Sequence, residues 1–165
     1  MGTRIKLAGA GGTHAASHYG TREIEDVLGS RYTGENGKNI MSYTFSFDDL
    51  PVATLDEAAL TIPANSFIVS ATLRVITAIA GTTPTLTLGL VEKDGTAIDA
   101  DGIDVAIAEA ALDAVGETVL CNGALVAALA GIGAERGQLV VTTGGTVTAG
   151  KFSLEIEYKE LLQRA

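Results

Sequence analysis

The clearest pattern of apolar and polar positions lies in the middle of the chain, at residues 65–92. Apolar and mixed side chains alternate from Phe67 to Ile76. After a short link the alternation returns as a leucine row, at Leu86, Leu88 and Leu90. Successive side chains of a strand point to opposite faces of a sheet, so each segment predicts a half-buried strand. Gly81 and Pro84 lie in the link, which predicts that the two strands form a β-hairpin.

The first strand of this hairpin has two faces of different character. One face is wholly apolar: Phe67, Val69, Ala71, Leu73 and Val75. The other face mixes Ile68 and Ile76 with Ser70, Thr72 and Arg74, a composition that suits contact with water or a partner subunit. Apolar periodicity of this kind reports packing. The hairpin therefore predicts a sheet core rather than a catalytic site.

Other segments alternate in the same way and predict further strands. The longer ones are residues 40–50, 138–142 and 151–159. Shorter strands are predicted at residues 58–62 and 117–121. The last long segment is the most regular, because its inward positions are all large and apolar and its outward positions are polar or charged. The inward positions are Phe152, Leu154, Ile156 and Tyr158.

Two stretches in the second half of the chain predict helices. Residues 103–115 carry apolar side chains at helical spacing, with Asp101 or Asp104 available to cap the start and Gly116 placed to end the helix. Residues 122–132 predict a second, short helix, although their glycines weaken it. Short strands, Gly-rich turns and one or two short helices together predict a mainly β fold, an antiparallel β-sandwich or jelly roll.

The N-terminal region differs in composition from the rest. Residues 1–39 are dense in Gly, Ser, Thr and Asn, and residues 21–29 offer at most one turn of helix. Such a segment buries too little apolar surface to become ordered by itself. It does carry spaced apolar and aromatic residues that could anchor it on a partner: Tyr19, Ile24, Val27, Leu28 and Tyr32. The sequence predicts an extended arm at residues 1–39 that orders on assembly, followed by one β domain at residues 40–165.

Charge and composition exclude several functions. The formal net charge is −9 and the isoelectric point is near 4.6, with the basic residues scattered, which argues against a nucleic-acid surface. The sequence contains no 18 consecutive apolar residues, so we expect no membrane span. The first apolar run is too short for a signal peptide. The single Cys121 lies in an apolar segment, where we expect a small buried hydrophobic residue.

Acidic residues between Asp94 and Asp104 are the main candidate for metal chemistry. With Asp99 and Asp101 they have the carboxylate spacing and the glycine of a calcium loop, but they lack the distal glutamate of the helical calcium hand. Turn and helix-cap roles explain them without a metal. His14 and His18 are four residues apart but have no acidic ligand nearby. We therefore predict no catalytic residue, metal or cofactor, and keep a calcium-dependent protein or enzyme as the less favoured alternative.

Taken together, these segments resemble the small decoration (cement) proteins of tailed-bacteriophage heads, and more loosely head-fibre base and other virion jelly-roll domains. Three stretches carry the resemblance: HYGTREIEDVLG with the strand that ends in SFDDLP; IPANSFIVSATLRV followed by TPTLTLGL and DGTAIDADGI; and TGGTVTAGKFSLEIEYKE. They cover most of residues 18–159 as a pattern of strands, turns and small residues.

The resemblance implies a non-enzymatic virion protein, made in the host cytoplasm and located on the outer capsid surface. It implies a homotrimer that bridges neighbouring major capsid proteins, and it provides no catalytic residues. From the residues themselves we expect the arm to contact the capsid, with strand addition as one mode. The expected contact residues are Tyr19, Arg22, Ile24, Val27 and Tyr32. The alternative is a head-fibre or receptor/glycan-binding module, which would need an exposed aromatic patch.

Overall fold

The computed structural model describes residues 22–23, 29–33, 39–50 and 61–160. Its strands are β1 (Arg22–Glu23), β2 (Gly29–Thr33), β3 (Asn39–Ser46), β4 (Ser66–Val91), β5 (Ala97–Ala108), β6 (Thr118–Leu120) and β7 (Gln138–Glu160). Helical structure in these residues is limited to short pieces: α1 (Ala124–Ala127) and the 3₁₀ turns η1 (Phe47–Asp49) and η3 (Glu109–Ala111). All strand pairings are antiparallel, which confirms the predicted fold class. None of the helical pieces has the length and hydropathy needed to cross a membrane.

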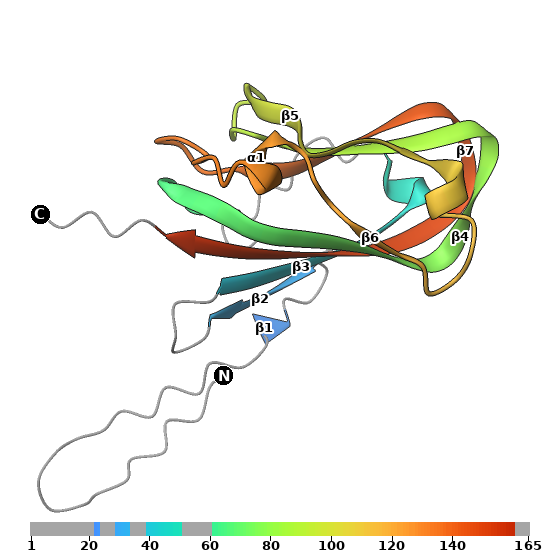
Figure 1. The fold of residues 1–165 in the computed structure, drawn as a ribbon, viewed down its shortest axis with the longest axis horizontal. Coiled ribbons are helices and arrows are strands. Elements are labelled where there is room, and N and C mark those ends of the chain that lie inside the picture. Colours follow the sequence, from blue (N-terminus) through green and yellow to red (C-terminus); the bar gives the residue numbers. More distant parts are fainter. Residues whose placement is uncertain (1–21, 24–28, 34–38, 51–60, 161–165) are drawn as a thin grey trace, which may run out of the picture.

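The two longest strands, β4 and β7, form one antiparallel ribbon that bends back on itself (Figure 1). At its open end Ser66 pairs with Glu160, and Val91 pairs with Gln138. The first half of β4 thus pairs with the second half of β7, and the second half of β4 with the first half of β7. The predicted hairpin is therefore wrong, because residues 80–84 bend a continuous strand and the two segments pair with β7 instead of with each other.

Glycine makes this bend possible. We call residues 78–84 of β4 and 144–150 of β7 the corner. At Gly81 a Cβ atom would lie 1.7 Å from the carbonyl oxygen of Thr146, so a side chain has no room there. Gly145 has φ of 66°, a left-handed conformation that glycine adopts without steric cost. Turns and corners use the same residue types, which is why the sequence pattern suggested a turn.

The bend divides the sheet into two layers. Layer A contains, in order, β1, β2, β3, the second half of β7, the first half of β4, and β6. Layer B contains the first half of β7, the second half of β4, and β5. The segment after β6 joins the layers on one side: Cys121 N donates to the Ala71 carbonyl of layer A, and Gly123 N donates to the Ile103 carbonyl of layer B, both at 2.9 Å.

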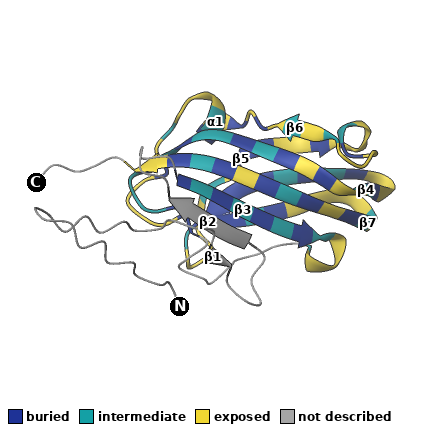
Figure 2. Cartoon of the chain, turned by 90° about the horizontal axis from the view of Figure 1, so that it is seen from below, coloured by how far each residue is buried: buried dark blue, intermediate teal, exposed yellow. Residues whose placement is uncertain are grey.

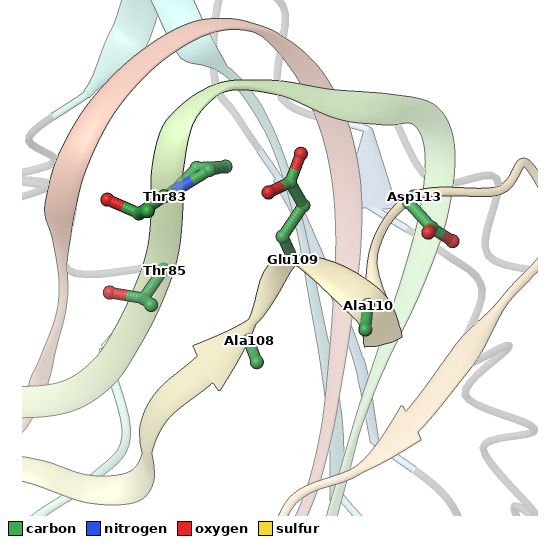
Figure 3. A pocket seen from close by; sticks show the side chains of 7 residues that line it. Thr83, Thr85, Ala108, Glu109, Ala110 and Asp113 are labelled. Carbon is green, nitrogen blue, oxygen red and sulfur yellow. The ribbon is translucent and has the colours of Figure 1, made fainter.

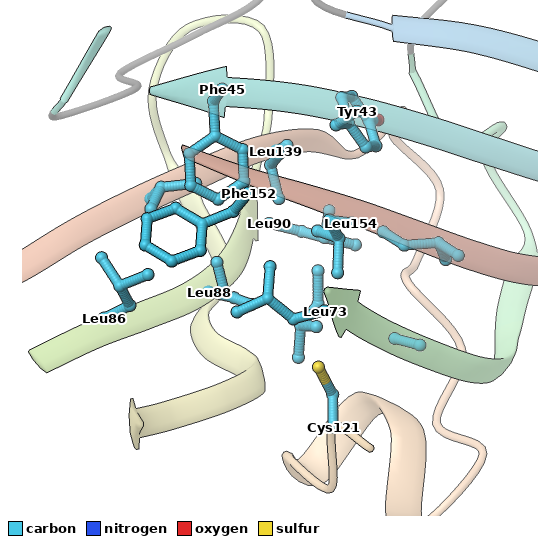
Figure 4. Packing of buried hydrophobic residues seen from close by; sticks show 14 of the residues in the cluster. Tyr43, Phe45, Leu73, Leu86, Leu88, Leu90, Cys121, Leu139, Phe152 and Leu154 are labelled. Carbon is cyan, nitrogen blue, oxygen red and sulfur yellow. The ribbon is translucent and has the colours of Figure 1, made fainter. Parts of the chain in front are cut away.

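A single hydrophobic core fills the space between the layers (Figures 2 and 4). Leucines of layer B face large apolar side chains of layer A: Leu86, Leu88, Leu90 and Leu139 against Leu73, Phe152 and Leu154. Phe45 and Phe152 are cross-strand partners, and their ring centroids lie 5.6 Å apart. The inward row predicted for the last strand is confirmed, since all four of its side chains are fully buried.

The helix predicted at residues 103–115 is wrong. β5 continues to Ala108, and only the short 3₁₀ turn η3 follows it. A wide bulge in β5 leaves four residues, 100–103, opposite the single residue Gly89 of β4. A second bulge sets Val105 and Ala106 opposite the single residue Thr87, so β5 loses its two-residue period within the residues whose spacing suggested a helix. The helix predicted at residues 122–132 is confirmed only as the four-residue α1.

A smaller bulge corrects the predicted faces of the first segment. The register of β4 against β7 shifts between Ile68 and Ser70. As a result Ile68 is fully buried, whereas Phe67 and Val69 are only half-buried. From Ala71 onward the predicted apolar face does point into the core.

The arm contributes strands to this sheet. β2 pairs with β3 across the predicted boundary between arm and domain, and β1 pairs with β2. Arg22–Glu23 is therefore strand, not the predicted helical turn. The boundary itself stays a prediction. The strand predicted at residues 58–62 falls mostly outside the described residues, and Ile62 makes an isolated bridge to Gly137.

Candidate functional site

The sequence predicts that five arm residues make the functional contact, and the structure describes the backbone of two of them. Arg22 lies in β1 and Tyr32 in β2, so both belong to the chain's own sheet. Tyr19, Ile24 and Val27 lie outside the described residues. The arm is thus joined to the domain by main-chain pairing. The role of the five side chains in binding a partner stays a prediction.

We call the edge of layer A formed by β1 and β2 the arm edge. In its register Arg22 is the Cα partner of Arg31, and Glu23 is the partner of Ser30. Two of the basic residues of the arm thus occupy opposite register positions on adjacent strands.

The acidic residues considered for calcium are divided among different local structures. Asp94 lies in the turn between β4 and β5, where its Oδ1 accepts a hydrogen bond from the Thr96 backbone N–H at 2.9 Å. This bond, followed by one from the Thr96 side chain, lowers the pKa of the Asp94 carboxyl. The Asp94 carboxylate therefore stabilises a turn.

Asp101 lies in the bulge of β5 at residues 100–103, and Asp99 and Asp104 are the paired residues on either side of it. The Asp99 Oδ1 accepts a weak hydrogen bond from the Asp101 N–H at 3.4 Å. Partial burial, followed by a side-chain hydrogen bond with Asp101, raises the pKa of Asp99. In the part of the chain that the structure describes, no three His, Cys, Asp or Glu side chains are grouped to hold a metal ion. The predicted pair His14 and His18 lies outside that part.

Cys121 is part of the hydrophobic core, where only 2% of its surface is exposed. Burial, and then the nearby charge of Asp104, raises the pKa of its thiol to about 12. Because the thiolate is the nucleophilic form, this thiol is unreactive at neutral pH. The predicted role as a small buried hydrophobic residue is confirmed.

A hollow of about 400 Å³ lies where the corner meets the segment after β5 (Figure 3). Its lining comes from these two segments: Thr83, Pro84, Thr85, Ala108, Glu109, Ala110 and Asp113. The carboxylates of Glu109 and Asp113 are exposed, and the lining includes no basic group, histidine or thiol to complement them. We therefore propose no catalytic or ligand-binding role for this hollow. The sequence did not reveal this hollow because residues 83–85 and 108–113 are far apart in the chain and the latter were expected in a helix.

Exposed aromatic side chains, which a glycan-binding module would need, are scarce. Within residues 39–50 and 61–160, Phe47 is the most exposed aromatic residue, at 36%. Tyr43, Phe45, Phe152 and Tyr158 are all buried in the core. The described surface therefore lacks an aromatic platform on which a sugar ring could stack.

No protein-family model matches the chain, and no curated protein matches its sequence. Two solved phage capsids contain chains of similar structure. A chain of the cyanophage Pam1 capsid asymmetric unit is 13% identical with a TM-score of 0.50, and the match covers 92% of this chain and 99% of that chain. A chain of the Ralstonia phage GP4 capsid is 15% identical with a TM-score of 0.48, covering 86% and 91% respectively.

The Pam1 match extends over nearly the whole length of both chains. This chain shares its fold with a component of a phage capsid. Identity of 13% shows a common fold and leaves function to other evidence. The resemblance to phage capsid-associated proteins that the sequence suggested is thus confirmed at the level of fold.

Proposed function

We propose that this chain is a non-enzymatic structural protein of a phage virion, which binds the outer capsid surface and bridges neighbouring major capsid proteins. The observation that carries the proposal is the fold shared with the Pam1 capsid chain over 92% of this chain and 99% of that chain. Coverage of both whole lengths means that the likeness is not limited to a common sheet motif. Synthesis in the host cytoplasm and a final location on the virion surface follow from this role.

The arm edge is our proposed contact with the capsid. Its arginines, Arg22 and Arg31, occupy opposite register positions and favour an acidic partner. The expected apolar and aromatic anchors Tyr19, Ile24, Val27 and Tyr32 lie in the same region of the sequence. One arm need not bind tightly, because many symmetric copies on one shell, and a homotrimer in particular, raise the effective concentration of each contact.

Co-sedimentation with head shells of the phage that encodes the chain tests this proposal. Three proteins are compared: the full chain, a truncation without residues 1–21, and a truncation without residues 1–38. The first truncation keeps β1 and β2, whereas the second removes both strands. We expect the full chain to pellet with the shells and the protein without residues 1–38 to remain in the supernatant while still folded by circular dichroism.

The shorter truncation separates two sources of affinity. Retained binding would assign the contact to β1 and β2, and lost binding would assign it to residues 1–21. A full chain that ignores the shells would refute the capsid role. Equal pelleting of all three proteins would retain the capsid role but refute the contribution of the arm.

A further inference from the structure

The edge of layer A opposite the arm edge exposes aliphatic side chains. This edge is formed by β6, which pairs with β4 at the far end of the strand order from β1. Leu120 is 71% exposed, Val115 just before β6 is 72% exposed, and Ile76 of β4 is 41% exposed. Isolated exposed aliphatic residues are ordinary, but several of them along one strand edge mark an interaction surface.

Two of these residues, Ile76 and Leu120, lie on the outer face of layer A. Leu73 and Val75 point into the core, so Thr72, Arg74 and Ile76 between and beside them point outward. Leu120 is the cross-strand partner of Thr72, and Thr118 is the partner of Arg74, so both lie on the same outer face. We call this surface, together with the exposed Val115 in the turn that precedes β6, the β6 patch: Thr72, Arg74, Ile76, Val115, Thr118 and Leu120.

The backbone of β6 also offers hydrogen bonds to a partner. Val75 N donates to the Glu117 carbonyl and Cys121 N donates to the Ala71 carbonyl, both at 2.9 Å. Because hydrogen-bonding directions alternate along a strand, the groups of Thr118 and Leu120 point away from β4. Among the described strands, none pairs with this side of β6. An edge of this kind accepts a further strand or backbone segment.

We propose that the β6 patch is the surface through which copies of this chain associate with each other. Copies with a net charge of −9 repel each other, but β6 itself contains no ionisable residue and adds no like charge to that repulsion. The same face also has both signs of charge: Thr72 is the partner of Glu155 as well as of Leu120, and Arg74 is two residues away. Arg74 of one copy can therefore meet Glu155 of the next.

The position of the patch separates this role from the proposed capsid contact. The arm edge and β6 are opposite edges of one sheet, so a copy bound through its arm edge leaves β6 accessible to a neighbour. Self-association through β6 requires only a second copy and no capsid. The inference can therefore fail while the proposed function stands, and the proposed function can fail while the inference stands.

Size exclusion with light scattering on the full chain, without shells, tests the inference. We expect the wild-type protein to exceed its monomer mass of 16.9 kDa. Leu120→Glu should weaken association by about tenfold or more, because it places a charge in the apolar contact. Val105→Glu is the matched control: Val105 is 56% exposed but lies on β5 of layer B, so association should stay at the wild-type level.

Circular dichroism checks that each variant is folded. If Leu120→Glu does not fold, Leu120→Ser and Val115→Ser replace it, and each should weaken association at wild-type helix and strand content. A wild-type chain that stays monomeric at the highest concentration it tolerates would overturn the inference. Association that is unchanged in folded Leu120 and Val115 variants, or lost equally in Val105→Glu, would also overturn it.

Discussion

The two edges of layer A are built from residues of different character. At the arm edge, the register places Arg22 and Glu23 of the two-residue β1 opposite Arg31 and Ser30 of β2. At the other edge, β6 has the sequence Thr-Val-Leu, and its Leu120 is 71% exposed. Short, charged edges resist unspecific strand pairing, whereas uncharged apolar edges invite it. We therefore propose a partner of complementary charge for the arm edge and a partner with apolar surface for β6.

Two edges of different character allow one sheet to bind two different partners. In the proposed capsid contact, charge at the arm edge would supply specificity and a salt-dependent rate of association. In the proposed self-association, apolar area at β6 would supply affinity that depends little on salt. A protein that must bind a shell and a neighbouring copy at the same time benefits from two contacts that do not compete for one surface.

The largest expected effect comes from breaking the corner, which joins layer A to layer B. Gly81→Val introduces a side chain whose Cβ would lie 1.7 Å from the Thr146 carbonyl oxygen. We expect a loss of on the order of 4 kcal/mol in the free energy of unfolding, or failure to fold, because backbone must move in both strands of the ribbon. Urea unfolding followed by circular dichroism measures this loss.

Gly95→Ala is the control for the corner. Gly95 has φ of 88° in the turn between β4 and β5, and a Cβ there would meet nothing within 4 Å. Only the left-handed conformation then opposes the substitution, at a cost of about 1 kcal/mol. Equal losses for both variants would show that the corner is not closely packed and would contradict this account of the sandwich.

The second prediction removes the charge of the arm edge. Arg22→Glu combined with Arg31→Glu should weaken binding to shells by about tenfold and make the remaining binding less sensitive to salt. The control Arg136→Glu reverses an exposed charge outside layer A, and this variant should bind shells as the wild type does. Co-sedimentation over a series of salt concentrations measures both. Unchanged binding of the double variant would contradict the arm edge as an electrostatic contact.

The third prediction concerns a variant in which β6 carries a charge, as the arm edge does. Thr118→Lys gives β6 the kind of charge that protects natural sheet edges. Self-association should fall several-fold, while the free energy of unfolding should change by no more than about 0.5 kcal/mol because Thr118 is exposed. Light scattering and urea unfolding measure the two quantities. If the free energy of unfolding fell by as much as the free energy of self-association, β6 would serve only to support the fold.

The smallest effects concern two aspartates with opposite pKa shifts. The lowered pKa of Asp94 stabilises the fold above the carboxyl's unfolded pKa, and this contribution is lost as the pH falls through the folded pKa. Asp94→Asn should therefore destabilise at pH 7 and lose its effect in acid. The raised pKa of Asp99 means that its charged form disfavours folding, so Asp99→Asn should stabilise at pH 7 and lose its effect in acid.

Thermal unfolding of both variants and the wild type at pH 7 and near pH 3 measures these effects. Calcium supplies a further check, because Asp94 stabilises a turn, Asp99 and Asp101 are joined by their own hydrogen bond, and the described carboxylates form no group of three that could hold a metal ion. Added calcium should leave the midpoint unchanged. Shifts of equal sign in the two variants, or a calcium-dependent midpoint, would contradict the local roles given to these carboxylates.

Regular alternation in the sequence was enough to predict most strands and the core. The row Phe152, Leu154, Ile156 and Tyr158 keeps a strict two-residue period, and all four are buried. Two features were beyond this reasoning for physical reasons. The corner uses the same glycines as a hairpin turn, and the bulge that sets Val105 and Ala106 opposite Thr87 disturbs the strand period of β5 so that it resembles a helix.

The candidate site was predicted less completely. The arm could be identified by its composition. The pairing of β2 with β3 could not be predicted, because a polar segment lacks the apolar alternation that indicates a strand. The β6 patch was hidden because Leu120 and Val115 stand on either side of Gly116 in a short, irregular segment. Their exposure becomes visible only when β4 supplies the neighbouring strand.

A cryo-electron microscopy map of head shells with the protein bound would show both proposed contacts in one measurement. We expect density for the β-sandwich on the outer shell, with β1, β2 and residues 1–21 against the major capsid protein and β6 against a neighbouring copy. A sandwich that contacts the shell through its corner, with the arm edge facing solvent, would refute the proposed capsid contact.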